Sequence, residues 1–247
     1  GTLAMVRAVE PGGLSEVWQV RRDVVVNMLE QRLVSEPFGV RHVGAPYRLS
    51  QQDGAYFVVP DFLDSTHPIE TADDAEAYLA RLAQFSSAIS EESEAQREEA
   101  SRGYLAPGWS LDLVKAQLAA QLAPPAADNG MVGSLARRTA AKGIAGDWAA
   151  RATKIVEGEV YPALREQLAL VEQLRPTTRE GDGEWRLPRG DEMYALALRY
   201  FTTTSLSAEE IHQTGLAQVA EISSELNGIL RKAGLTKGSV GERLVAL

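Results

Sequence analysis

Three capping boxes constrain this chain most strongly toward helices. In a capping box, the side chain of a Ser or Thr at the helix start accepts a hydrogen bond from the backbone N–H three residues later. The acidic side chain of that later residue accepts one from the backbone N–H of the Ser or Thr. The pattern pairs Thr71 with Asp74, and a Ser-x-x-Glu version begins at Ser207 and at Ser239. Each box predicts the first turn of a helix.

Apolar residues recur at spacings of three and four, which places them on one face of a helix. The stripes with these spacings are Tyr78, Leu82, Phe85 and Ile89; Leu111, Val114, Leu118 and Leu122; and Val160, Leu164, Leu168, Val171 and Leu174. Two further expected helices carry Met193, Leu196, Leu198 and Phe201, and Ile211, Val219, Ile222, Leu226 and Ile229. We therefore predict an all-α fold, a bundle-like array of helices with long loops and little or no β-structure.

Proline and glycine mark the expected breaks. The segment from Ala123 to Gly133 is predicted to be a loop, and Pro162 predicts a kink or break near Val160 in the helix running from Asp147 to Leu174. We expect Trp185 and Leu187 to anchor the Gly-rich segment before Gly190. The only strand signals are the short runs 56–59 and 185–187.

The chain is predicted to be a single helical segment, 1–247, of a larger protein, with possible sub-lobes 1–125 and 140–247. The Ser239 capping box starts a helix that stops at Leu247, so we expect more protein after it. Gly1 stands where a native chain has Met, and no leader pattern follows, so a native leader could have been left out. The compartment stays open: a soluble protein, either cytoplasmic or exported.

Composition excludes several classes of partner and site. The net charge of −9 and the lack of a basic block argue against nucleic acid. No run approaches the roughly 20 apolar residues of a membrane span. With no cysteine, disulfides and thiolate metal sites are excluded. The acidic cluster Glu91, Glu92, Glu94, Glu98 and Glu99 is expected to be a solvated helix face.

No complete catalytic or metal site is predicted. The histidines are His42, His67 and His212, and none has the His-Glu-x-x-His spacing of a zinc helix. We expect His67 to cap a helix end from a loop and His212 to lie half exposed in a first helical turn. No Gly-x-Ser-x-Gly, Walker or dinucleotide motif occurs.

Hydroxyl groups gather where a helix is expected to end. Tyr200, Thr202, Thr203 and Thr204 lie there, with His212 one helix start later. They could contact a substrate or cap the helix locally. We take them as the candidate substrate-binding residues and predict no catalytic or metal-binding residue.

Separated strings also resemble a known family. They are Val59–Leu63, His67–Ile69, Ala75–Leu82, Val160–Ala163, Trp185–Pro188 with Gly190 and Asp191, Leu198–Leu206, Glu209–His212, and Gly215 with Leu216. In this order they resemble the bacterial "domain of unknown function 885" family, from about Asp23 to Leu230.

The resemblance implies a helical protein similar to gluzincin-type zinc metallopeptidases. Family members carry their His-Glu zinc segment and a further Glu ligand after the Thr-Thr-Thr region, so no metal ligand maps onto this chain, and zinc is expected in the missing C-terminal half. Members often have His where this chain has Tyr200 and Phe201. The implied partners are a peptide-like substrate of the full-length protein and the missing C-terminal half.

Three hypotheses follow. The chain is the N-terminal part of a zinc-peptidase-like hydrolase and forms a wall of its substrate cleft; it is a stand-alone helical binding or scaffold module; or it belongs to a relative that has lost catalysis. A reading frame that continues into a His-Glu zinc helix favours the first, a native stop near Leu247 the second, and a C-terminal half without those ligands the third.

The histidine spacing predicts that this chain binds no stoichiometric zinc. Elemental analysis after dialysis checks this prediction. One tightly held zinc per chain, lost in a His67→Ala/His212→Ala double variant, would contradict it.

Overall fold

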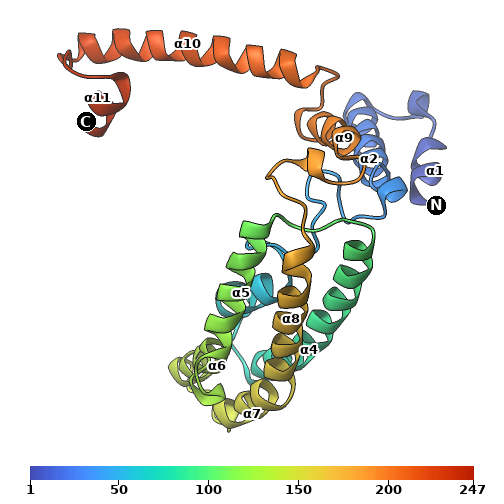
Figure 1. Ribbon diagram of the computed structural model, residues 1–247, viewed down its shortest axis with the longest axis vertical. Coiled ribbons are helices and arrows are strands. Elements are labelled where there is room, and N and C mark those ends of the chain that lie inside the picture. Colours follow the sequence, from blue (N-terminus) through green and yellow to red (C-terminus); the bar gives the residue numbers. More distant parts are fainter. The chain divides into compact units, whose positions relative to one another are not determined.

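The computed structural model describes all 247 residues, and it is all-α as predicted (Figure 1). The one β-type interaction is an isolated bridge between Ser50 and Asp53. Contacts divide the chain into two compact units, Gly1–Met193 and Tyr194–Leu247. No helix is long and apolar enough to cross a membrane.

The first unit contains eight α-helices and the start of a ninth. The eight are α1 (Thr2–Arg7), α2 (Glu16–Leu33), α3 (Ala55–Asp61), α4 (Ala72–Ser101), α5 (Gly108–Leu122), α6 (Gly130–Ala141), α7 (Trp148–Ile155) and α8 (Tyr161–Leu174). Two π-helical turns, η3 (Phe62–Thr66) and η5 (Val156–Val160), follow α3 and α7. Short 3-10 turns are η1 (Pro11–Gly13), η2 (Glu36–Phe38), η4 (Ala126–Asp128), η6 (Arg175–Thr177) and η7 (Glu184–Arg186).

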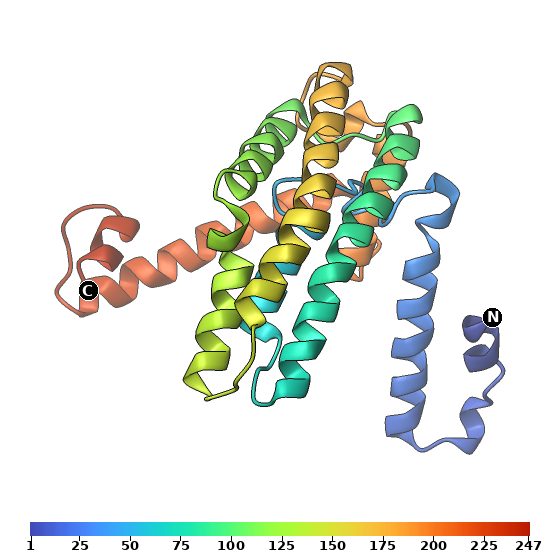
Figure 2. The ribbon, with the colours of Figure 1, turned by 90° about the horizontal axis from the view of Figure 1, so that it is seen from below.

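The core of this unit lies where α8 packs against both α4 and α5, with α6 and α7 beside them (Figure 2). The stripe predicted on α4 is fully buried, with Phe85 1% exposed and Tyr78, Leu82 and Ile89 at 0%. Residues of α5 and α8 join the same cluster. This shared core includes residues from α4 to α8, and the sub-lobes 1–125 and 140–247 suggested from sequence stay a prediction.

The capping box at Thr71 starts α4 as predicted, because the Asp74 backbone donates to the Thr71 hydroxyl and the Asp74 carboxylate accepts from the Thr71 backbone. The break at Pro162 also occurs. Between α7 and α8 the backbone forms the π turn η5, which ends at Val160. A π turn absorbs the backbone bond that proline cannot donate, and such turns are a common site of a helix kink.

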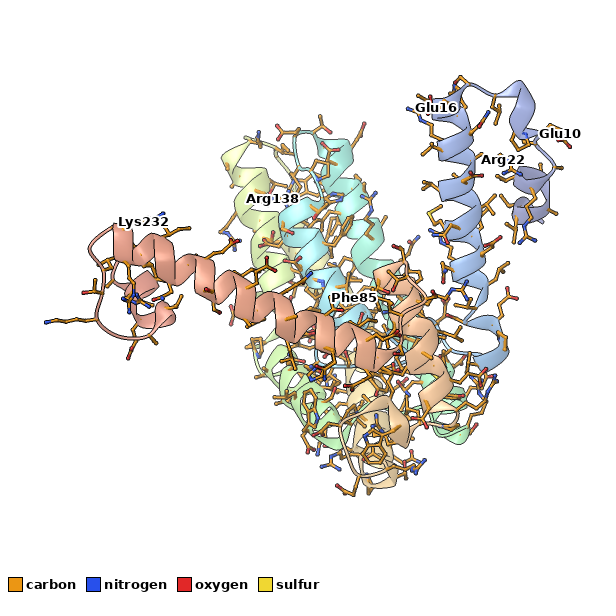
Figure 3. All side chains as sticks on the ribbon, turned by 90° about the horizontal axis from the view of Figure 1, so that it is seen from above. Glu10, Glu16, Arg22, Phe85, Arg138 and Lys232 are labelled. Carbon is orange, nitrogen blue, oxygen red and sulfur yellow. The ribbon has the colours of Figure 1, made fainter.

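The N-terminal hairpin consists of α1 and α2, which pack against each other. The Arg22 guanidinium donates to the carbonyl oxygens of Arg7 and Val9, and Arg7 pairs with Glu30. Figure 3 shows Arg22 on the side of α2 that faces this N-terminal segment. No residue of α2 is buried.

The second unit contains the end of α9 (Gly190–Thr202), the long helix α10 (Ala208–Lys232) and the short helix α11 (Val240–Val245). The capping boxes at Ser207 and Ser239 start α10 and α11. The chain then turns back at Gly234, whose φ of 83° suits glycine. Helix α11 packs on the end of α10, where Arg243 donates to the Asn227 side chain.

Four sequence expectations were wrong in detail. Residues 56–59 lie in α3 and not in a strand, and residues 185–186 lie in the 3-10 turn η7. The expected loop from Ala123 to Gly133 already contains the start of α6, a helix that had not been predicted. Leu187 is buried at 3%, but Trp185 is 62% exposed and does not anchor its segment.

The core packing predicts a large cost for truncating Phe85, which Figure 3 marks within the helical body. Phe85→Ala should lower the free energy of unfolding by about 3–5 kcal/mol, because it removes a buried ring and leaves a cavity. Phe57→Ala, at a residue 43% exposed in the same unit, is the matched control and should cost much less. Equal losses in urea denaturation would contradict this packing.

Candidate functional site

The predicted substrate-binding hydroxyls lie at the turn that joins α9 to α10. The Thr202 hydroxyl donates to the Leu198 carbonyl over 2.7 Å and lies 3.0 Å from the Thr204 hydroxyl. The Thr204 backbone donates to the Thr202 hydroxyl, and the Leu206 backbone to that of Thr204. The structure therefore brings Thr202 and Thr204 together, and their hydroxyls satisfy the end of α9.

Thr203 has a φ of 56°, in the left-handed region. A β-branched residue there is an outlier that costs on the order of 1–3 kcal/mol. Glycine or asparagine would close the same turn with less strain. The position thus keeps a strained threonine side chain where helix termination alone does not need one.

Aromatic rings and a histidine flank this turn. The rings of Tyr200 and Phe201 meet edge to face with centroids 5.1 Å apart, and Phe201 is 66% exposed. His212 lies in α10 and is exposed rather than half exposed. No hydrogen bond joins His212 to the threonines. The group offers hydroxyl donors and aromatic surface for binding, but no base beside a nucleophile.

The apolar stripe of α10 follows this turn, and most of its side chains are exposed. Leu230 is the one buried residue of the helix. The exposed fractions are 53% for Leu216, 64% for Val219, 54% for Ile222 and 61% for Ile229. An apolar stripe of this length is uncommon on the surface of a finished domain.

His67 is a structural residue. It is 2% exposed, its Nε2 lies 2.9 Å from the Asp74 carbonyl, and its Nδ1 lies 2.7 Å from the Arg81 guanidinium. Arg138 donates to the carbonyl oxygens of Leu63, Asp64 and His67, which fixes the end of η3. Nowhere do three or more His, Asp or Glu side chains gather closely enough to hold a metal ion.

Two glutamates of the acidic cluster on α4 are not solvated, which corrects the sequence interpretation. Glu99 is 2% exposed and accepts two hydrogen bonds from the Arg48 guanidinium, at 2.9 and 3.1 Å. The Glu92 carboxylate accepts from the Ala55 backbone at the start of α3 and from the Gln167 amide of α8. Burial raises the pKa of both carboxyl groups.

A second polar group missed from sequence surrounds Arg186. This arginine is 1% exposed and donates to the Tyr47 hydroxyl and to the Leu105 carbonyl. In the same turn, Oε2 of Glu184 is buried without a hydrogen-bond partner. Burial raises the pKa of Glu184 to about 7. These contacts hold the segment before α9 against the body, a role the sequence had assigned to Trp185.

Two clefts lie in the first unit. One of about 460 Å³ is lined by Asp61, Asp64 and Arg137 near the start of α6, and one of about 500 Å³ lies between α1 and α2. In the first, Asp64 and Arg137 are 3.7 Å apart and largely exposed. Neither cleft contains a residue that the sequence had singled out for function.

The raised pKa of Glu184 predicts a pH dependence. The pKa of this carboxyl is higher in the folded state than the unfolded value of 4.5. Its contribution to stability is therefore fully present below the unfolded pKa, where the carboxyl is protonated in both states. This contribution is lost as the pH rises through about 7. Glu184→Gln should therefore gain stability relative to the wild type between about pH 5 and about pH 8.

Urea denaturation at several pH values measures the gap in unfolding free energy between Glu184→Gln and the wild type. Glu180→Gln, in the neighbouring loop, is the control. A gap that stays constant with pH, or that closes as the pH rises, would show that the Glu184 carboxyl is not buried as described.

Comparison with known proteins identifies the family of this chain. No curated protein matches the chain. A solved structure, "the putative lipoprotein from Colwellia psychrerythraea", matches with a TM-score of 0.74 and 29% identity, over 81% of this chain and 35% of that one. The chain thus spans about a third of the length of that protein. The model of the family described as "Bacterial protein of unknown function (DUF885)" matches residues 1–247, and the chain belongs to this DUF885 family.

Proposed function

We propose that this chain is the N-terminal helical part of a zinc-metallopeptidase-like hydrolase. It forms one wall of the substrate cleft, and polypeptide outside this sequence carries the metal and the catalytic base. The support from comparison is length, since the solved relative has nearly two thirds of its chain outside the matched region.

The observation that carries the proposal is the uncovered stripe of α10 next to the strained turn at Thr203. A 25-residue helix that buries only Leu230 gains little from packing, and isolated helices are marginal in water. A further polypeptide surface over Leu216, Val219 and Ile222 would supply the missing packing. The turn would then lie at the edge of that contact, where a substrate can reach it.

Each group at the turn has a defined role in this proposal. Hydroxyls of Thr202, Thr203 and Thr204 and the ring of Tyr200 bind and orient a peptide-like substrate, and His212 offers a further donor or acceptor. Zinc, when bound in the catalytic part, polarises the scissile carbonyl. This chain contributes binding and orientation only.

A stand-alone helical binding or scaffold module is the second candidate. It is favoured by the same uncovered stripe, because an amphipathic helix face is a common way of binding another helix. The two candidates differ in chemistry. The first requires a hydrolase assembled with further polypeptide, and the second requires only binding.

The exposed stripe predicts dye binding by the isolated chain. Val219→Asp/Ile222→Asp should clearly lower the fluorescence of a bound hydrophobic dye, because two charges then interrupt the apolar surface. Ala217→Asp/Ser224→Asp places the same charges on the opposite face of α10 and is the matched control. The isolated chain should show no peptidase activity with zinc added.

Two results would contradict the proposal. One is a chain whose dye binding does not change with the stripe variants, which would mean that its own residues cover α10. The other is zinc-dependent peptide cleavage by the purified 247-residue chain, abolished by a chelator, which would place the catalytic groups within it.

A further inference from the structure

A second uncovered apolar surface lies on α2, on the side opposite α1. Gln19, Arg22 and Glu30 bond toward the α1 segment and define the inner side of the helix. Val17, Val20, Val24 and Met28 follow spacings of three, four and four and lie on the other side. Their exposed fractions are 61%, 59%, 61% and 44%.

The position of each residue in this stripe fits a short coiled coil. With Val17 and Val24 at the first core position of the seven-residue repeat, Val20 takes the second core position. Asn27, one repeat after Val20, takes the second core position again and interrupts the apolar stripe.

The charges beside the stripe of one copy are complementary to those of a second copy. Glu16 and Asp23, seven residues apart, lie along one flank, and Arg21 lies on the other flank. In a parallel pair, the residue just before the first core position of a repeat faces the residue five positions later in the partner helix, which lies on the opposite flank. Glu16 of one copy would therefore face Arg21 of the other, twice by symmetry. Neither Glu16 nor Arg21 forms an ion pair within its own chain, although Arg21 stacks on Trp18 at 4.7 Å.

We propose that the outer face of α2 is a homodimer interface, in which two copies of this chain pair through parallel, in-register α2 helices. The interface buries Val17, Val20 and Val24 at its centre and joins Glu16 to the partner's Arg21. Helix α1 packs on the opposite side of α2, so it leaves this face free. The proposal is independent of the hydrolase role.

Light scattering after size exclusion tests the pairing directly. Because two heptads make a short interface, the wild type should show a concentration-dependent equilibrium between 26.8 kDa and twice that mass. Val20→Asp/Val24→Asp should weaken dimerisation about a hundredfold or more, since it buries charges. Val58→Asp on α3, at a valine 54% exposed, is the matched control and should leave the equilibrium unchanged.

Charge reversal tests the parallel register. Glu16→Arg and Arg21→Glu should each weaken dimerisation about tenfold, because each replaces two attractive contacts by repulsive ones. The double variant Glu16→Arg/Arg21→Glu should restore it, because the reversed charges again face each other. An antiparallel pair would bring the same flanks together and give no such rescue.

The absence of cysteine permits a clean cross-linking control. Val20→Cys should form a covalent dimer under mild oxidation, because equivalent core positions of parallel helices lie within disulfide reach. Val58→Cys on α3 should not form one. A chain that stays monomeric at all concentrations, or a dimer insensitive to the α2 variants, would overturn the proposal.

Discussion

The packing of α8 against α4 and α5 is the contact on which the first unit depends. Leu164 and Val171 of α8 join the cluster formed by Phe85 and Leu82 of α4 and by Val114 of α5. The π turn η5 joins α7 to α8 just before Pro162, and its residues Val156 and Val160 are fully buried in the same core.

Buried polar contacts add a second layer to this core. The carboxylates of Glu92 and Glu99 on α4 hold the start of α3 and the side chain of Arg48. Arg186 holds Tyr47 and Leu105 from the other end of the unit. A buried charge is costly unless it is paired and hydrogen-bonded. These contacts therefore fix the irregular segment between α2 and α3 more specifically than apolar packing would.

Sequence reasoning recovered what is encoded locally. The capping boxes and the stripe through Phe85 were sufficient, because both depend on residues within a few turns of each other. It missed the burial of Glu99, because the partner is 51 residues away in a segment without periodicity. It read residues 56–59 as a strand, because a short apolar run fits either structure, and the group that caps α3 is the distant Glu92. At the candidate site it identified the hydroxyl turn but not the strain at Thr203.

The chain thus combines a packed helical body with two helices, α2 and α10, whose apolar faces are exposed. Hydrogen exchange by mass spectrometry on the monomeric chain tests this contrast most directly, because amide protection reports local opening energies. Amides of α4 and α8 should exchange at the slow rate of global unfolding, and those in the middle of α10, around Val219 and Ile222, should exchange faster by orders of magnitude. Equal protection of α10 and α4 would mean that α10 is already covered by its own chain, and it would contradict the account.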